Sequence, residues 1–310
     1  MARALRKPNA AAVTPLTGEQ EELYQAYSAS YGSVGAQRRY EFIVDGLFAF
    51  VALIIVGSSV FELAEDFRDA ASRWIPLVTL LWLGVRESRV FGNPQAQRLE
   101  AVNLQEQFDL SFWKGQDWRS VWNNLLLASP VPRRTVKERA ASFRGETISP
   151  TYWVDTSALT ASAAALARIM QSAGWGERGH RRYADLNSAA SVAVLVVLVV
   201  CSAVGGLDTL DLAAATMAVA PILTGRLAAA RAHGNLSQSR RDLEDHAEQL
   251  LLGSTLPSDQ DVRSAQDELV RLRLEDRRIP EWLYRRYKDR DEQSIDSAAL
   301  EIVGRAAARP

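Results

Sequence analysis

Four apolar runs, arranged as two pairs, interrupt a chain that is otherwise charged and helical in its pattern. The clearest run covers residues 188–207 and contains no charged side chain. Its length is close to the ~20 apolar residues that a helix needs to cross the hydrocarbon core of a bilayer. A core helix of a soluble protein usually keeps one polar face, and a strand usually ends after ~4–8 residues. The run therefore predicts a membrane-spanning helix, with a buried core helix as the alternative.

The other three runs complete two hairpins. Residues 42–61 carry a single charge, Asp45, about one turn after their start. Residues 74–85 are short for a span, but arginines bracket them and can extend their side chains to the interface. Residues 210–225 follow the 188–207 run after a Gly–Gly turn, and Pro221 within them predicts a kink. The pattern predicts an all-α membrane protein with two transmembrane hairpins, and so four spans.

Helical spacing recurs in the charged stretches outside these runs. Within residues 19–41, the side chains of Leu23, Tyr27 and Tyr31 fall on one stripe, as in a solvated amphipathic helix. Further helices are predicted at 95–108, at 158–170 and after Ser258, where acidic residues follow the helix start. In the last of these, apolar residues recur at spacings of 3, 4 and 3: Val262, Ala265, Leu269 and Leu272. Residues 91–187, between the two hairpins, and residues 229–310, after the second hairpin, are therefore expected to be mainly helical.

Three glycines precede the second hairpin, in a stretch that begins at Gly174 and ends at Gly179. The stretch matches GxGxxG, which indicates a dinucleotide-binding turn only where it follows a strand. No strand pattern precedes it, so the glycines predict a simple turn or loop.

The distribution of charge predicts the orientation in the membrane. The net charge is −1 and favours no particular partner. The links within the two pairs, residues 62–73 and 204–211, are acidic overall, whereas arginines gather in the other segments. The positive-inside rule therefore places both termini and the insert in the cytoplasm. The expected organisation is an N-terminal arm and helix (1–41), a first hairpin (42–90), an insert (91–187), a second hairpin (188–228) and a C-terminal helical region (229–310).

No catalytic, metal or cofactor site can be recognised. The single cysteine, Cys201, excludes an internal disulfide and a cysteine metal cluster, and the three histidines lack metal-ligand spacing. No P-loop, nucleophile elbow or HExxH motif is present. We expect neither enzymatic activity nor a cofactor.

Arginines and aromatic residues of the insert form one candidate site. Guanidinium groups match phosphate oxygens and aromatic rings stack on bases, which is the chemistry that a nucleotide ligand needs. The same residues also suit a surface that faces anionic lipid, at about 1 kcal/mol for each basic residue. The candidate ligand-binding residues are Arg133, Arg134, Arg139, Tyr152, Trp153, Arg181, Arg182 and Tyr183. Arginines of the C-terminal region form a rival site: Arg271, Arg273, Arg277 and Arg278.

Charged residues at the ends of the apolar runs form a second candidate set. In an oligomer they could line the mouth of a pore, and singly each suits interfacial anchoring. They are Asp45, Arg73, Arg86 and Arg226.

Three stretches of the chain carry a resemblance to a known family. They are NLQEQFD at 103–109, the stretch from YW at 152–153 to HRRY at 180–183, and AQDE at 265–268 with IPEWLY at 279–284. In their order, and with the two-hairpin layout, they are similar to the SMODS-associated four-transmembrane effectors. The resemblance covers residues 20–300.

This resemblance implies a pore-forming effector of a bacterial antiphage system, the cyclic-oligonucleotide-based signalling known as CBASS. A cyclic oligonucleotide made by a linked nucleotidyltransferase would activate it to permeabilise the inner membrane and cause abortive infection. The implied partners are this second messenger, membrane lipid and further copies of the chain, without direct DNA or RNA binding. The implied location is the bacterial inner membrane, as a multi-pass protein. The alternative is a membrane-anchored nucleotide sensor or scaffold without a pore; a membrane enzyme ranks last, because it lacks a recognisable residue set.

Overall fold

The described part of the chain is helical throughout. The computed structural model describes residues 16–33, 94–113, 130–145, 153–205, 209–275 and 279–308, with positions 74, 77 and 81. These residues contain no strand, which agrees with the predicted all-α class. Most of the first hairpin at 42–90 lies outside the described residues, and so do Asp45, Arg73, Arg86 and Tyr152.

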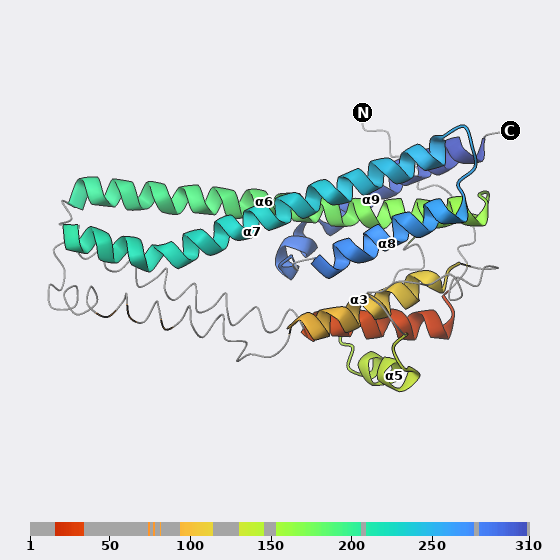
Figure 1. The fold of residues 1–310 in the computed structure, drawn as a ribbon, viewed down its shortest axis with the longest axis horizontal. Coiled ribbons are helices and arrows are strands. Elements are labelled where there is room, and N and C mark those ends of the chain that lie inside the picture. The colour runs from red at the N-terminus through yellow and green to blue at the C-terminus, as the bar shows by residue number, and fades with distance from the viewer. Residues whose placement is uncertain are drawn as a thin grey trace, which may run out of the picture.

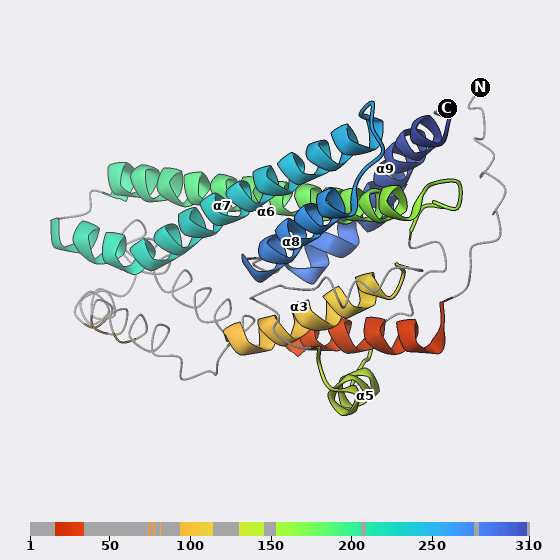
Figure 2. The same cartoon turned by 45° about the vertical axis from the view of Figure 1, so that its right-hand side comes forward.

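Two long helices dominate the molecule. Helix α6 (Ala161–Gly205) has 45 residues and α7 (Thr209–Leu252) has 44, so each extends for about 67 Å at 1.5 Å per residue. They run side by side in opposite directions in both views (Figures 1 and 2). Figure 1 also shows that α7 changes direction within its first third, the part that contains the predicted kink at Pro221. Residues predicted as insert and as membrane span therefore belong to one continuous helix.

The main core lies where four helices meet. Helices α8 (Asp259–Glu275) and α9 (Glu281–Ala307) pack against the N-terminal half of α6 and the C-terminal half of α7. Leu166, Leu251, Leu269 and Leu272 are almost completely buried there. The spacing predicted for α8 is confirmed, because its four stripe positions are all buried: Val262, Ala265, Leu269 and Leu272.

A smaller cluster of helices packs on α8. Helix α3 (Pro94–Leu110) contacts α8 through Val102 and Val270, both fully buried. Residues 18–33 form a helix against the other side of α3, and α5 (Arg133–Ala141) packs there too. The predicted stripe of the N-terminal helix is confirmed, but it is not solvated. Leu23 and Tyr27 are buried against Phe108, because aromatic rings from three segments fill the space.

Local sequence explains where two of these helices begin. The backbone N–H of Ser258 donates to Asp261 Oδ2 at 2.8 Å, and the N–H of Asp261 donates to Ser258 Oγ at 3.2 Å. This reciprocal capping box satisfies donors that the first turn of α8 leaves without a helical partner. Thr17 and Gln20 form the same arrangement at the start of the N-terminal helix.

The C-terminal half of α6 is apolar and largely uncovered. Of the described residues, Ala161–Val200 is the one helical segment long and apolar enough to cross a membrane, and only 11% of its most apolar window is buried. A core helix of that composition would be mostly buried, so the exposure favours the membrane-spanning interpretation over the alternative. Trp74, Leu77 and Leu81 of the first hairpin are likewise helical and exposed. The exposed apolar residues of α6 beyond Ser191 are Val192, Leu195, Val196, Val197, Val199, Val200 and Val204.

The turn predicted between Gly174 and Gly179 is wrong. These residues lie within α6, although glycine in a helix interior costs about 1 kcal/mol relative to alanine. The reason is close packing. A Cβ added to Gly174 would lie 2.8 Å from Glu244 Oε1, and one added to Gly176 would collide with the guanidinium of Arg240. The glycines therefore let long polar side chains of α7 lie flat across α6.

Two glycines should respond to alanine with opposite signs. We expect Gly176→Ala to destabilise the protein by about 1–3 kcal/mol, because Arg240 is buried and cannot move aside without strain. We expect Gly234→Ala in α7 to stabilise it by about 0.5–1 kcal/mol, because nothing beyond the adjoining residues and backbone of α7 lies within 4 Å of the new methyl group. Thermal unfolding of the detergent-purified variants measures both. Equal shifts of the melting temperature would contradict the close-packing role of Gly176.

Candidate functional site

The arginines predicted on α5 are all engaged by carboxylates. Arg139 donates from Nε to Glu100 Oε1 at 2.6 Å and from Nη2 to Oε2 at 3.2 Å, a two-pronged contact with α3. Arg133 lies 2.8 Å from Glu22, and Arg134 lies 2.8 Å from Glu138, one turn further along α5. Both views show α3 between α5 and α6. The structure therefore does not bring these arginines together with the candidates on α6.

Trp153 is held at the edge of the main core. Its ring stacks on that of Trp175, with ring centres 5.3 Å apart and planes inclined by 24°, and it meets Phe112 edge-on. Trp153 therefore packs on another aromatic side chain in this conformation, whereas the prediction gave it a ligand base to stack on.

Arg181 and Arg182 lie on α6 about two turns before the apolar half begins. Arg182 forms a fork with the carboxylate of Asp291 on α9, including Nη2–Oδ1 at 2.6 Å, and its Cζ lies 4.3 Å from the ring centre of Tyr287. Arg181 pairs with the buried carboxylate of Glu177 at 3.1 Å, which Arg241 of α7 also reaches at 3.0 Å. These contacts join α6 to both α7 and α9 just outside the apolar region.

A buried pair of histidines, one from α6 and one from α7, lies next to these contacts. His180 and His233 are each 1% exposed, and their Nδ1 atoms are 2.7 Å apart. One Nδ1 must donate a proton and the other accept it, so both rings cannot be protonated at Nδ1 with this contact intact. The ring of Tyr183 meets the His233 ring edge-on, with the ring centres 4.7 Å apart. Among the described residues, no group of three or more side chains could hold a metal ion.

Of the four residues predicted to line a pore or to anchor the chain at the interface, Arg226 lies in the part of the chain that the structure describes. Its guanidinium donates to Asn187 Oδ1 at 3.1 Å, across the hairpin from α7 to α6. Asn187 is buried, and its own side chain amide donates to the carbonyl of Tyr183 one turn earlier. The contact joins α6 and α7 at the first residue before the 188–207 run, where the sequence predicts the membrane interface.

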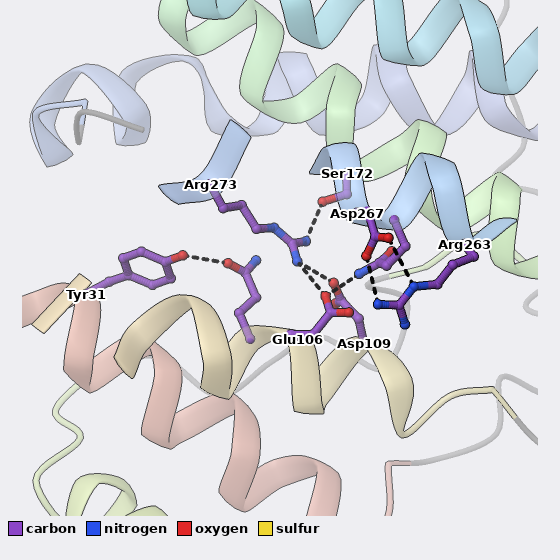
Figure 3. Close-up of polar contacts among 9 residues, drawn as sticks. Tyr31, Glu106, Asp109, Ser172, Arg263, Asp267 and Arg273 are labelled. Atoms are coloured by element: carbon purple, nitrogen blue, oxygen red, sulfur yellow. Dashed lines mark hydrogen bonds and ion pairs between the residues drawn. The ribbon is translucent and has the colours of Figure 1, made fainter. Parts of the chain in front are cut away.

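A second polar cluster, which the sequence did not predict as a site, lies buried where α3 meets α8. Figure 3 shows Arg273 of α8 between Asp109 of α3 and Ser172 of α6. Arg273 donates to Asp109 Oδ2 at 2.6 Å and to Ser172 Oγ at 3.0 Å, and it is 3% exposed. Glu106 lies 4.0 Å from the same guanidinium and accepts a hydrogen bond from Gln266.

Burial and neighbouring charges shift the pKa values of Glu106 and Arg273 in this α3–α8 cluster. Burial, followed by repulsion from Asp109, raises the pKa of Glu106 to about 8, although Arg273 and Gln266 act in the opposite direction. Burial alone would lower the pKa of Arg273, but Asp109 and other negative neighbours outweigh it and the pKa is raised. At neutral pH, Arg273 and Asp109 therefore form the charged pair and Glu106 is largely protonated.

A small cavity adjoins the cluster and is lined by parts of three stretches that carry the family resemblance. Asp109 comes from the first stretch, Trp153 and Arg168 from the second, and Gln266 from the third. The cavity holds about 10 Å³, room for about one water molecule, so no nucleotide fits it in this conformation. An open depression on α7 is lined by Asp245 and Glu248, whose charges oppose a phosphate ligand. The family resemblance marks these three stretches in the sequence, but only the fold shows that they meet at one cluster.

Comparison with known proteins found one family. The family model described as the SMODS-associating 4TM effector domain matches residues 14–302, almost the whole chain. The searches of the curated proteins and of the solved structures found no match. The match confirms the family to which the three stretches point.

Proposed function

The chain belongs to the SMODS-associating 4TM effector family, whose members are membrane effectors linked to nucleotidyltransferase systems, and from this we propose a gated membrane function. A cyclic oligonucleotide binds the cytoplasmic part, and several copies of the chain then open a pore in the bacterial inner membrane. The infected cell stops growing before phage is released. The linked nucleotidyltransferase supplies the oligonucleotide.

The continuity of α6 and α7 is the observation that carries this proposal. Each helix begins or ends in the buried four-helix core and continues without a break into the apolar half of the hairpin. Because a helix transmits a tilt or rotation along its length, a change at the core moves the apolar half directly. A separate soluble domain on a loop would have no such coupling.

We place the ligand contacts of the gate at Arg181, Arg182 and Tyr183, with the α5 arginines as the alternative set. The guanidinium of Arg182 donates two hydrogen bonds to the two carboxylate oxygens of Asp291. It can bind two oxygens of a phosphate in the same way. A phosphate that replaced Asp291 would detach α9 from α6 close to the membrane. Several such contacts can supply the ~5.5 kcal/mol preference needed to shift a population from 1:99 to 99:1.

Release of a small dye from liposomes that contain the purified protein tests the proposal. We expect release with one member of a panel of cyclic di- and trinucleotides, and none without nucleotide. We expect Arg182→Ala to abolish binding of that nucleotide while insertion is unchanged. Arg134→Ala is the matched control, because it removes an arginine whose side chain is 89% exposed and which, among the described residues, pairs with Glu138 of its own helix.

The other outcomes discriminate among the alternatives. Nucleotide binding without dye release, in vesicles that hold inserted protein, would show an anchored sensor or scaffold. Loss of binding in Arg134→Ala but not in Arg182→Ala would move the ligand site to α5. Release that is independent of every nucleotide would contradict gating.

A further inference from the structure

The first turns of α9 carry aromatic and basic side chains on the part of the helix nearest to the membrane. We propose that this segment, residues 280–290, is a lipid-binding surface that recognises anionic head groups of the cytoplasmic leaflet. The proposal requires the membrane location that the family implies, but it requires neither a pore nor a nucleotide. It therefore stands or falls separately from the gating proposed above.

Two polar contacts between α6 and α9 show how this segment lies along α6. Gln171 of α6 donates to Asp296 of α9 at 2.7 Å, and Arg182, eleven residues later in α6, binds Asp291, five residues earlier in α9. The two helices therefore run in opposite directions, and α9 approaches the apolar half of α6 towards its own start. Figure 1 shows the same arrangement, with the beginning of α9 as the end nearest to the apolar halves of α6 and α7.

The helical rise converts these contacts into a position. Arg182 lies six residues, or about 9 Å, before the start of the apolar run at Ser188. Ile279, two residues before α9, lies against Gly179 of α6, nine residues or about 14 Å before Ser188. The first turns of α9 therefore lie on the cytoplasmic side of the apolar run, where the long side chains of Trp282 and the neighbouring arginines can extend towards the lipid head groups.

The side chains of the segment suit that position. Trp282 and Tyr284 are more than half exposed, and tryptophan and tyrosine are enriched at membrane interfaces because their rings are apolar with a polar edge. Arg285, Arg286 and Arg290 are exposed as well, and basic residues close to a bilayer surface attract anionic lipid. The sequence of the segment contains four basic residues and two acidic ones, so its net charge is positive.

The helix also provides a matched internal control. Trp282 and Leu300 are both exposed, at 57% and 44%, and are separated by 18 residues, which is five full helical turns. They therefore lie on the same face of α9, about 27 Å apart along its axis. Trp282 lies at the end of α9 that is nearer to the apolar half of α6, whereas Leu300 lies farther away on the cytoplasmic side.

A fluorophore at these two positions tests the proposal. In the full chain with Cys201→Ser, the only native cysteine is removed, and Trp282→Cys or Leu300→Cys then carries a single environment-sensitive label. Each labelled protein is reconstituted into vesicles of equal anionic content, with bromine placed either on phosphatidylglycerol or on phosphatidylcholine. We expect quenching at position 282 to be at least twofold stronger with the brominated anionic lipid. We expect position 300 to remain unquenched in both.

Charge reversal separates lipid recognition from simple proximity. We expect Arg285→Glu with Arg286→Glu to equalise the quenching by the two lipids at position 282, while flotation shows unchanged insertion. Equal quenching by both lipids in the parent protein would overturn recognition of anionic head groups. Absence of quenching at position 282, or quenching at 300 of the same strength, would overturn the placement of the segment at the interface.

Discussion

Replacing Arg273 by methionine should lower the free energy of unfolding by about 3–5 kcal/mol, the usual cost of removing one partner from a buried ion pair. The reason is that Asp109 would remain buried without the guanidinium that it contacts at 2.6 Å, and Ser172 would lose its donor. Methionine keeps much of the volume of the side chain, so the loss reports charge more than a cavity. Thermal unfolding of the purified protein should show a decrease in melting temperature of at least about 6 °C.

Glu106→Gln is the matched control for this substitution. Because the pKa of Glu106 is raised to about 8, its carboxyl is largely neutral at pH 7, and a neutral amide of similar shape should cost less than about 1 kcal/mol. A raised carboxyl pKa means that the folded state binds a proton that the unfolded state releases. Stability should therefore fall as the pH rises from about 4.5 to about 8, and the fall should be smaller in Glu106→Gln. Glu244, whose pKa is raised to about 7 by burial, leaves a residual slope of the same sign.

A melting temperature for Arg273→Met within about 2 °C of the parent value would contradict the assigned ion pair. So would an equally large effect of Glu106→Gln at pH 7, because that result would require a charged Glu106.

Introducing arginine at Val196 should prevent the second hairpin from spanning the membrane. Val196 lies near the middle of the apolar half of α6 and is 54% exposed. An arginine at the centre of a span costs about 2.5–3.5 kcal/mol, comparable to the roughly 3–6 kcal/mol that ten valine and leucine residues at 188–207 contribute together. A reporter enzyme active only outside the cytoplasm, inserted at residues 206–208, should lose most of its activity in Val196→Arg.

Leu256→Arg is the control for the added charge. Leu256 is 73% exposed in the connection between α7 and α8, on the cytoplasmic side of the proposed topology. We expect full reporter activity in this variant. Full activity in Val196→Arg as well, or no activity in the parent protein, would contradict the prediction that α6 crosses the bilayer.

The main helices could be predicted because their signals are local. The capping box at Ser258 and the stripe from Val262 to Leu272 are patterns within one helix, and the structure has that helix where they place it. The failure at Gly174–Gly179 has a tertiary cause. Glycine favours turns on its own, and only contact with Glu244 and Arg240 of α7 makes it suitable for a helix. A pattern within α6 cannot report a contact that α7 supplies.

The candidate site shows the same division. Arginine content indicated phosphate chemistry, but it could not indicate that Arg133, Arg139 and Arg182 each meet a carboxylate from another helix. Composition counts charges, whereas the availability of a charge depends on which helix packs beside it. Whether these residues bind a nucleotide stays a prediction.

The sequence by itself determined the helical class, the apolar run of α6 and the family, because each depends on residues that are near in the chain or on their order. Only the tertiary structure decided that Glu106, Asp109 and Arg273 share one buried site, and that α9 contacts α6 six residues before its apolar run. Arg273 is 164 positions from Asp109 in the chain, and Asp291 of α9 is 109 positions from Arg182 of α6. Their electrostatic interaction depends on distance in space and on exclusion of water, and both arise only when α3, α6, α8 and α9 pack together.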